Sequence, residues 1–389
     1  MPDFNPLIAR LSPPPIPAVL AWAASYDGSK GPLIDLSQAV PGYPPHPDML
    51  EWLAETAGSR SYSGYGAIEG EDILRTAYAA HVSELYGAPV TADSIHITSG
   101  ANQAFMCLAM AVAGHGDTIA VTNPFYFNQA TTLSMLGIRS VLIDCDPQAS
   151  FLPDLDAVTT ALVPGVKALV LVTPNNPTGA VYPAELLREI FLLCRQNETW
   201  LIVDETYRDF LSEGTGAPHD LLTIPGWQDT LALTYSFSKS YCIPGHRLGA
   251  ITAGEAMVAQ VAKVMDNLQI CAPRAAQAAV ARAIPALSDW RHANRAEITS
   301  RAEALKDVMS RLPKWEIQAI GAYFAYIRHP FADAGSELVA EKLARQAGIV
   351  CLPGAFFGER QENYLRFAFA NADAPTLRLL EARLTDFGI

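Results

Sequence analysis

Between about residues 94 and 254 the sequence alternates short apolar, β-branched runs with stretches of helical pattern. This alternation is typical of a mostly parallel sheet covered by helices. Six runs are expected to be strands: SIHIT, TIAVTN, ALVLVT, WLIVDE, TLALTYS and LGAITAG. Between two of them, PAELLREIFLLCRQN predicts a helix whose apolar face should cover the sheet, with Leu186, Ile190, Phe191 and Cys194 on that face.

The C-terminal part has a different pattern. The stretch LSDWRHANRAEITSRAEALKDVMSRL is charged and helical, and it is followed by the strand-like runs GAYFAYIR, IVCLP and YLRFAFA. The runs SELVAEKLARQAG and TLRLLEARLTDF indicate helices between and after them. We therefore expect an α/β protein in three segments: an N-terminal arm (1–45) that adds to the small domain, a large domain (46–285) with a mostly parallel seven-stranded sheet, and a smaller α+β domain (286–389).

Composition excludes several classes of function. The chain has 389 residues, half of them apolar, which is enough for two domains with a large core. A net charge of -13 without any Lys/Arg cluster argues against nucleic-acid or anionic-membrane partners. Six cysteines lie far apart without metal-ligand spacing, so we expect no disulfide framework, no metal site and a reducing cytoplasm. No signal peptide or membrane span is predicted.

Polar residues follow the expected strands at their carboxyl ends, where open α/β sheets bind ligands. In ITSGANQAFMCLAMAV the strand ends at Ser99, and the backbone N–H groups of Gly100, Ala101 and Asn102 open an apolar helix. Such N–H groups fit a phosphate, although a plain turn capped by Ser99 has the same pattern. In LVTPNNPTG the amide of Asn176 follows another strand, within a sequence that is also typical of a turn.

Two further strand ends carry charged groups. In WLIVDETYRDF, Asp204 ends an apolar strand and needs a cationic partner, unless it caps a following helix. In SFSKSYCIPGHR, a lysine buried beside the sheet would have a lowered pKa and would suit Schiff-base chemistry. Ser236, Ser238 and Arg247 surround this residue, Lys239, with phosphate donors.

These groups require one another. An aldehyde for Lys239, a basic ring nitrogen for Asp204 and a phosphate for the serines, Arg247 and the helix N-terminus are all present in pyridoxal phosphate. The motifs, in this order from about Asp35 to Ala370, make the chain resemble the class I/II pyridoxal-phosphate aminotransferases of fold type I.

The resemblance implies a role for each motif residue. Lys239 would form the Schiff base, and Ser236, Ser238 and Arg247 would bind the phosphate with the loop at Gly100, Ala101 and Asn102. The DETY segment would pair Asp204 with the pyridinium nitrogen and Tyr207 with the phenolic oxygen. The last two cofactor contacts come from NNPTG, in which Asn176 would reach the same oxygen, and from NPFYF, in which Tyr126 would stack on the ring.

Two more motifs concern the substrate and a second subunit. YSGYGAIEG resembles the element whose tyrosine reaches the phosphate of a neighbouring subunit, so Tyr65 implies a homodimer with shared sites. YLRFAFA resembles the strand whose arginine binds the substrate α-carboxylate. Alternation along this run also separates Arg366 from Leu365 and Phe367.

The activity implied is transfer of an amino group between an L-amino acid and a 2-oxo acid, with Lys239, Asp204 and Tyr207 as the catalytic residues. A β-lyase on the same scaffold, such as a carbon-sulfur lyase, remains the alternative, because the cofactor residues are shared. A transcriptional regulator with this fold is disfavoured by the acidic charge.

The chain departs from the family pattern at four positions. Ala39 stands where relatives have glycine near the substrate carboxylate, so that a methyl group is expected to narrow the pocket, and the glycine is shifted to Gly42. Ala101 replaces a hydroxyl residue. Asn267 aligns with the arginine that dicarboxylate-specific members use, so that route to aspartate or glutamate specificity is not expected. Arg274 lies nearby in the sequence and offers either a substitute cation or a solvated surface charge.

Overall fold

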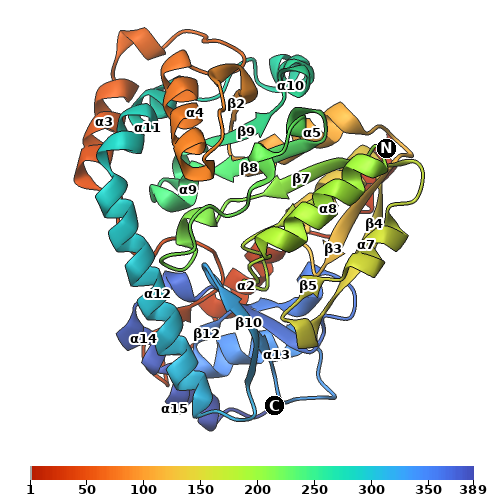
Figure 1. The fold of residues 1–389 in the computed structure, drawn as a ribbon. Coiled ribbons are helices and arrows are strands. Elements are labelled where there is room, and N and C mark those ends of the chain that lie inside the picture. The colour runs from red at the N-terminus through yellow and green to blue at the C-terminus, as the bar shows by residue number, and fades with distance from the viewer. Residues whose placement is uncertain (1) are drawn as a thin grey trace.

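The computed structural model describes residues 2–389, and its larger part is built on an eight-stranded sheet in the order β2-β9-β8-β7-β6-β3-β4-β5 (Figure 1). The strands of this sheet are β2 (Ile95–Thr98), β3 (Thr118–Asn123), β4 (Arg139–Asp146), β5 (Leu152–Pro153), β6 (Val166–Val172), β7 (Trp200–Asp204), β8 (Leu231–Ser236) and β9 (Gly249–Ala253). The five strands from β8 to β4 pair in parallel, whereas β9 runs antiparallel to both neighbours and β5 is antiparallel to β4.

The expected mostly parallel sheet is confirmed, with the two-residue strand β5 added at its edge. All six runs predicted to be strands are strands. The seventh long strand, β4, was not among those runs. Of its eight residues only Ile143 and Cys145 are buried, because β4 lies near the open edge of the sheet. The apolar run that identified the central strands is therefore missing from its sequence.

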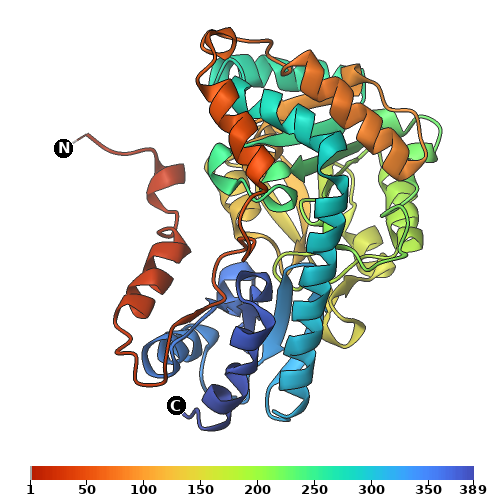
Figure 2. The same cartoon turned by 90° about the vertical axis from the view of Figure 1, so that its left-hand side faces the viewer.

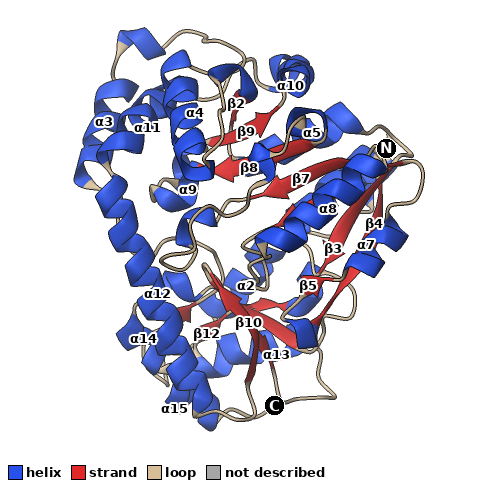
Figure 3. Cartoon of the chain, viewed as in Figure 1, coloured by secondary structure: helices blue, strands red, loops and turns tan. Residues whose placement is uncertain are grey.

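Helices cover both faces of this sheet (Figure 3). They are α3 (Pro47–Ala57), α4 (Asp72–Tyr86), α5 (Ala101–Val112), α6 (Phe127–Leu136), α7 (Leu155–Ala161), α8 (Ala184–Gln196), α10 (Glu255–Leu268) and α11 (Arg274–Ala286). In α8 the buried face consists of Leu187, Ile190, Phe191 and Cys194. Leu187 takes the place predicted for Leu186, since positions 187, 190, 191 and 194 follow the helical repeat.

The C-terminal part has an antiparallel sheet of its own, in the order β10-β11-β14-β13. Its strands are β10 (Glu316–Gly321), β11 (Phe324–Arg328), β13 (Leu352–Pro353) and β14 (Tyr364–Phe367), and its helices are α12 (Ser288–Ser310), α13 (Ser336–Lys342), α14 (Ala374–Arg378) and α15 (Leu380–Thr385). A π-helical turn, Leu343–Ala347, extends α13. The expected α+β composition is confirmed, and β10 is an additional strand that sequence reasoning missed.

The N-terminal segment joins this smaller part. Its strand β1 (Ile34–Asp35) pairs in parallel with β12 (Ile349–Val350). Before it, α1 (Pro6–Ala9) and α2 (Pro15–Ala24) run along one side of the molecule (Figure 2).

The buried apolar side chains form two main clusters, one around the large sheet and one around the C-terminal sheet. Ile34 and Leu36 belong to the second cluster, which agrees with an N-terminal contribution to the small part. The boundaries at 45/46 and 285/286 stay predictions. Across residues 2–389, no helix has the length and apolar character needed to cross a membrane.

Candidate active site

The strands β6, β7 and β8 end at one edge of the large sheet, and a cavity of about 170 Å³ lies there. Ten predicted site residues line it, together with Val172, Thr206 and Pro244: Ala101, Asn102, Tyr126, Asn176, Asp204, Tyr207, Ser236, Ser238, Lys239 and Arg247. The fold therefore brings together residues that are up to about 150 positions apart in the sequence.

One wall of the cavity has the features of an anion site. Gly100 precedes α5 with φ of 88°, a backbone conformation that favours glycine, and a Cβ there would collide with the guanidinium of Arg247. The first N–H groups of a helix have no intrahelical partner, so those of α5 are available to a ligand. Ser238 Oγ is buried and has no hydrogen-bond partner within residues 2–389. These groups fit the phosphate that the sequence predicted.

The lining of the cavity also includes a buried carboxylate. Asp204 ends β7, and its Oδ1 accepts hydrogen bonds from the backbone N–H and the hydroxyl of Thr206, at 3.0 and 2.7 Å. Oδ2 accepts a bond from Gln129 Nε2 at 3.2 Å. Burial raises the pKa of Asp204, because no cationic side chain among the described residues forms an ion pair with it. A protonated ring nitrogen would supply the missing positive charge.

Lys239 enters the cavity from α9 (Phe237–Ser240), a single helical turn that follows β8 directly. Burial, with help from the cations of Arg366 and Arg247, lowers its pKa from 10.5 to about 8. Its Nζ donates to the backbone carbonyl of Ala39. The contact at this position is therefore made by the main chain, whereas the sequence had drawn attention to the methyl group.

The loop that carries Ala39 is held by close packing. A Cβ at Gly42 would come within 2.6 Å of both Arg301 Nη1 and the carbonyl oxygen of Asn371. Val40 N–H donates to Asn371 Oδ1 at 2.9 Å. The glycine that seemed displaced in the sequence thus allows the loop to approach α12 and the end of β14.

Arg366 lies on β14 with its side chain buried, and Leu365 and Phe367 belong to the apolar cluster on the other face. Its Nη1 donates to Asn176 Oδ1 at 2.9 Å, and its Nη2 donates to the carbonyl of Ser37. Nε has no partner within residues 2–389. Burial lowers the pKa of Arg366 to about 10. No carboxylate within residues 2–389 forms an ion pair with this guanidinium, so an anionic ligand would stabilise its charge.

The aromatic residues of the site differ in their positions. Tyr207 is buried against Tyr323 and Phe324, with ring centroids 5.3 and 5.0 Å away, and burial raises its pKa. Tyr126 faces the cavity, and its hydroxyl accepts a bond from Asn128 at 2.8 Å. Tyr65 does not line the cavity, and 79% of its surface is exposed.

The two positions considered for dicarboxylate recognition lie elsewhere. Asn267 Nδ2 donates to the carbonyl of Lys263 within α10. Arg274 binds Glu71 at 2.6 Å and the carbonyl of Gly64 at 3.1 Å. Its guanidinium is therefore already paired within the chain.

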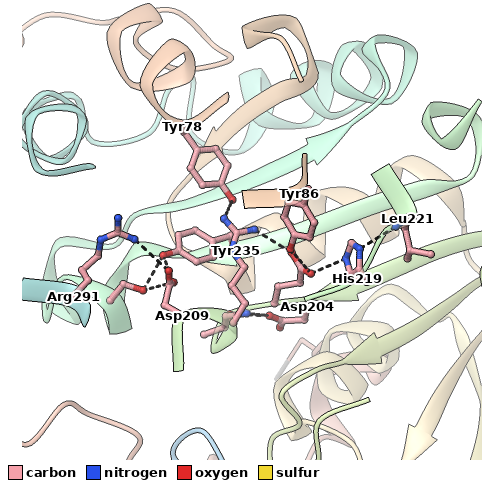
Figure 4. A network of polar contacts seen from close by, with 12 residues as sticks. Tyr78, Tyr86, Asp204, Asp209, His219, Leu221, Tyr235 and Arg291 are labelled. Atoms are coloured by element: carbon pink, nitrogen blue, oxygen red, sulfur yellow. Dashed lines mark hydrogen bonds and ion pairs between the residues drawn. The ribbon is translucent and has the colours of Figure 1, made fainter. Parts of the chain in front are cut away.

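Sequence reasoning missed a polar cluster behind the site (Figure 4). The carboxylate of Glu205 is fully buried and accepts from Tyr86 Oη at 2.7 Å and from Arg208 Nη1 at 3.0 Å, and His219 Nε2 lies 2.8 Å from it. Burial opposes ionisation, but these contacts hold the pKa of Glu205 below its usual value. In the sequence, only the charged residues Glu205 and Arg208 just after Asp204 pointed to this cluster, since Tyr86 lies 119 positions from Glu205.

Comparisons with known proteins place the chain in one family. Residues 31–384 match the family model described as aminotransferase class I and II. The chain is 29% identical to the aromatic aminotransferase ISS1 of Arabidopsis thaliana over 358 residues, which covers 90% of this chain and 88% of that protein. It is also 29% identical to a valine–pyruvate aminotransferase of Mycobacterium tuberculosis, covering 93% of each.

A solved structure of Thermus thermophilus aspartate aminotransferase with maleate superposes with a TM-score of 0.89 at 25% identity. The superposition covers 98% of this chain and 99% of that one. The structure of Bna3p from Saccharomyces cerevisiae, a putative kynurenine aminotransferase, has a TM-score of 0.90 at 20% identity, with coverage of 99% and 98%, and it supports the fold alone.

Proposed function

Because this chain belongs to the class I and II aminotransferase family, we propose that it binds pyridoxal phosphate through Lys239 and transfers amino groups between L-amino acids and 2-oxo acids. The observation that carries the proposal is one cavity lined by three groups that match the aldehyde, the ring nitrogen and the phosphate of the coenzyme. Its lining includes a lysine with a lowered pKa, a carboxylate without a cationic partner within residues 2–389, and an anion site whose Ser238 hydroxyl has no hydrogen-bond partner within the same residues.

Each wall has an assigned task in binding. Ser236, Ser238, Arg247 and the N-terminus of α5 would hold the phosphate. Asp204 would keep the ring nitrogen protonated. The residues assigned to the rest of the ring are Tyr207 and Asn176 for the phenolic oxygen and Tyr126 for the ring face. When bound, pyridoxal phosphate supplies the electron sink that stabilises negative charge at the substrate Cα.

The chain itself moves protons and orients the substrate. With a pKa of about 8, about a tenth of Lys239 Nζ is neutral at pH 7, far more than for an ordinary lysine, so it can act both as a nucleophile and as a base. Arg366 would bind the α-carboxylate, which amino acids and 2-oxo acids share, with the Nε that has no partner among residues 2–389. The hydrogen bond from Arg366 to Asn176 connects this carboxylate-binding group to a residue that lines the coenzyme cavity.

The proposed substrate class follows from which cations remain free. Arg366 accounts for one carboxylate, whereas Arg274 is paired with Glu71 and Asn267 carries no charge. We therefore infer that the amino donor is a monocarboxylic amino acid. The aromatic and valine–pyruvate aminotransferases named above are examples of relatives with such donors in their names.

We also propose a homodimer with shared sites. Tyr65 is exposed and lies outside the cavity of its own chain, although the family motif that contains it reaches a phosphate. A second subunit would supply this contact. Sedimentation equilibrium tests the dimer, and Tyr65→Phe should weaken coenzyme binding without dissociating the subunits.

The decisive test is chemical. After incubation with pyridoxal phosphate and reduction with borohydride, the digested wild-type protein should carry a pyridoxyl group on the peptide that contains Lys239, and Lys239→Ala should carry none. Single amino acids should then convert the bound coenzyme to its pyridoxamine form. Release of pyruvate and ammonia without that conversion would instead identify a β-lyase.

A further inference from the structure

The carboxylate of Asp209 joins two segments of the candidate active site that are far apart in the sequence. It belongs to the segment 204–210, which runs from the last residue of β7 into the turn that follows it. Its Oδ2 accepts hydrogen bonds from the hydroxyls of Tyr235 and Ser240, each at 2.6 Å, and these hydroxyls lie 2.8 Å from each other (Figure 4). Ser240 directly follows Lys239 in α9.

Asp209 is ionised and almost buried. Its Oδ1 lies 3.3 Å from Arg291 Nη1, and the exposed fractions of the two side chains are 12% and 10%. Burial opposes ionisation, but Arg291, Arg208 and His81 lower the pKa of Asp209 to about 2. Hydrogen bonds to an ionised acceptor are shorter and stronger than neutral ones, so this carboxylate is a firm anchor for both hydroxyls.

The turn that carries Asp209 presents its side chains to two sides. Asp204, Thr206 and Tyr207 line the active-site cavity. Glu205 and Arg208 belong to the buried cluster described above. The buried cluster around Glu205 and Arg208 therefore holds this turn in place. The hydrogen bond from Ser240 to Asp209 then sets the distance between the turn and α9.

We propose that Asp209 is a positioning residue. Through Tyr235 and Ser240 it sets the place of Lys239 relative to the other residues that line the active-site cavity. None of its three hydrogen-bond partners lines the active-site cavity, so it acts on the reaction only through α9. This inference rests on the proposed function, in which Lys239 is the coenzyme-binding amine.

A second cavity allows a sharp test. It measures about 620 Å³, it shares no lining residue with the active-site cavity, and Asp209, Arg291 and His81 are in its wall. Replacing Asp209 by alanine leaves the guanidinium of Arg291 without its carboxylate beside this open space. Formate from solution can reach that position and replace the lost acceptor.

The experiment compares Asp209→Ala, Asp209→Asn and a control, Glu84→Gln, whose exposed side chain lines the same second cavity. One readout is kcat and KM of the coenzyme-loaded protein. The second uses coenzyme-free protein and follows trace acetylation of Lys239 against pH, which reports the environment of its amine directly.

We expect Asp209→Ala to lower kcat at least about tenfold with KM nearly unchanged, because displacement of a reacting group by an ångström has effects of this size. The midpoint of Lys239 acetylation should move to higher pH, since a displaced ammonium regains solvent. Formate should restore part of kcat in Asp209→Ala. Glu84→Gln should behave as wild type in both readouts.

Asp209→Ala leaves the cation of Arg291 unpaired in a nearly buried place and could disturb folding, so a second variant keeps this ion pair. The double variant Tyr235→Phe, Ser240→Ala removes the link from the other side and leaves the Asp209–Arg291 pair intact, so it should reproduce the fall in kcat. Folded Asp209→Ala and double variants with wild-type kcat and an unmoved acetylation midpoint would overturn the inference. Absence of a pyridoxyl group on Lys239 in the wild-type protein would instead overturn the proposed function.

Discussion

Replacing Lys239 by methionine should make the coenzyme-free protein more stable near neutral pH. Because burial lowers the pKa of Lys239 from 10.5 to about 8, the folded protein binds its proton less tightly than the unfolded chain does. Each pKa unit corresponds to about 1.4 kcal/mol, so this ammonium costs the folded state about 3 kcal/mol at pH 7.

The sign and the pH range follow from the same two values. Between pH 8 and 10.5 the unfolded chain holds the proton that the folded protein has lost, so the wild-type free energy of unfolding rises with pH in this range. At pH 9.5 the remaining cost is about 1 kcal/mol. The stability advantage of Lys239→Met should therefore shrink by about 2 kcal/mol between pH 7 and pH 9.5.

Urea unfolding of both proteins at several pH values, without coenzyme, measures this difference. Taking the difference cancels the titration of all other groups. Lys167→Met, which removes an exposed lysine from β6, controls for the change in net charge. A stability difference between wild type and Lys239→Met that stays constant from pH 7 to 9.5 would refute the claim that burial lowers the pKa of Lys239.

Three further predictions concern binding and catalysis. Arg366→Lys should lower kcat/KM at least about a hundredfold, mostly through KM, because one ammonium cannot serve Asn176, the Ser37 carbonyl and a substrate carboxylate together; a steady-state assay with unchanged KM would contradict this. Gly100→Ala should weaken coenzyme binding at least about tenfold in a fluorescence titration, because the methyl group meets Arg247 and φ is 88°, and wild-type affinity would count against the anion site. Asp204→Asn should bind the coenzyme yet lose about a thousandfold or more of kcat in the same assay, since an amide cannot hold the ring proton, and retained turnover would exclude its role.

The sequence predicted the fold and most of the cavity because both depend on local patterns. Asp204 was found because a carboxylate ends an apolar strand, and Lys239 because it follows another strand among serines. In a parallel sheet, such positions meet at one edge whatever the details of packing. For Arg366 the family resemblance named the residue, and the two-residue alternation along its strand placed it on the face of β14 that looks away from the apolar cluster.

Residues whose importance depends on distant contacts were missed. Gln129 belongs to a helix with no evident link to Asp204, and its hydrogen bond exists only once β3 and β7 lie in one sheet. Asp209 was part of a quoted motif, but its partners Tyr235 and Arg291 are 26 and 82 positions away. Tyr65 and the domain boundaries stay predictions.

The helix α12 runs from the large part of the molecule into the small part (Figure 1), and this has a mechanical consequence. Its 23 residues form a rod about 35 Å long. Near one end Arg291 binds Asp209, and about three turns further on Arg301 donates to the Ala370 carbonyl just after β14. Because such a helix is a stiff body, a rotation of β14 would be transmitted along α12 to Asp209 and, through its hydrogen bonds, to the turn that carries Lys239.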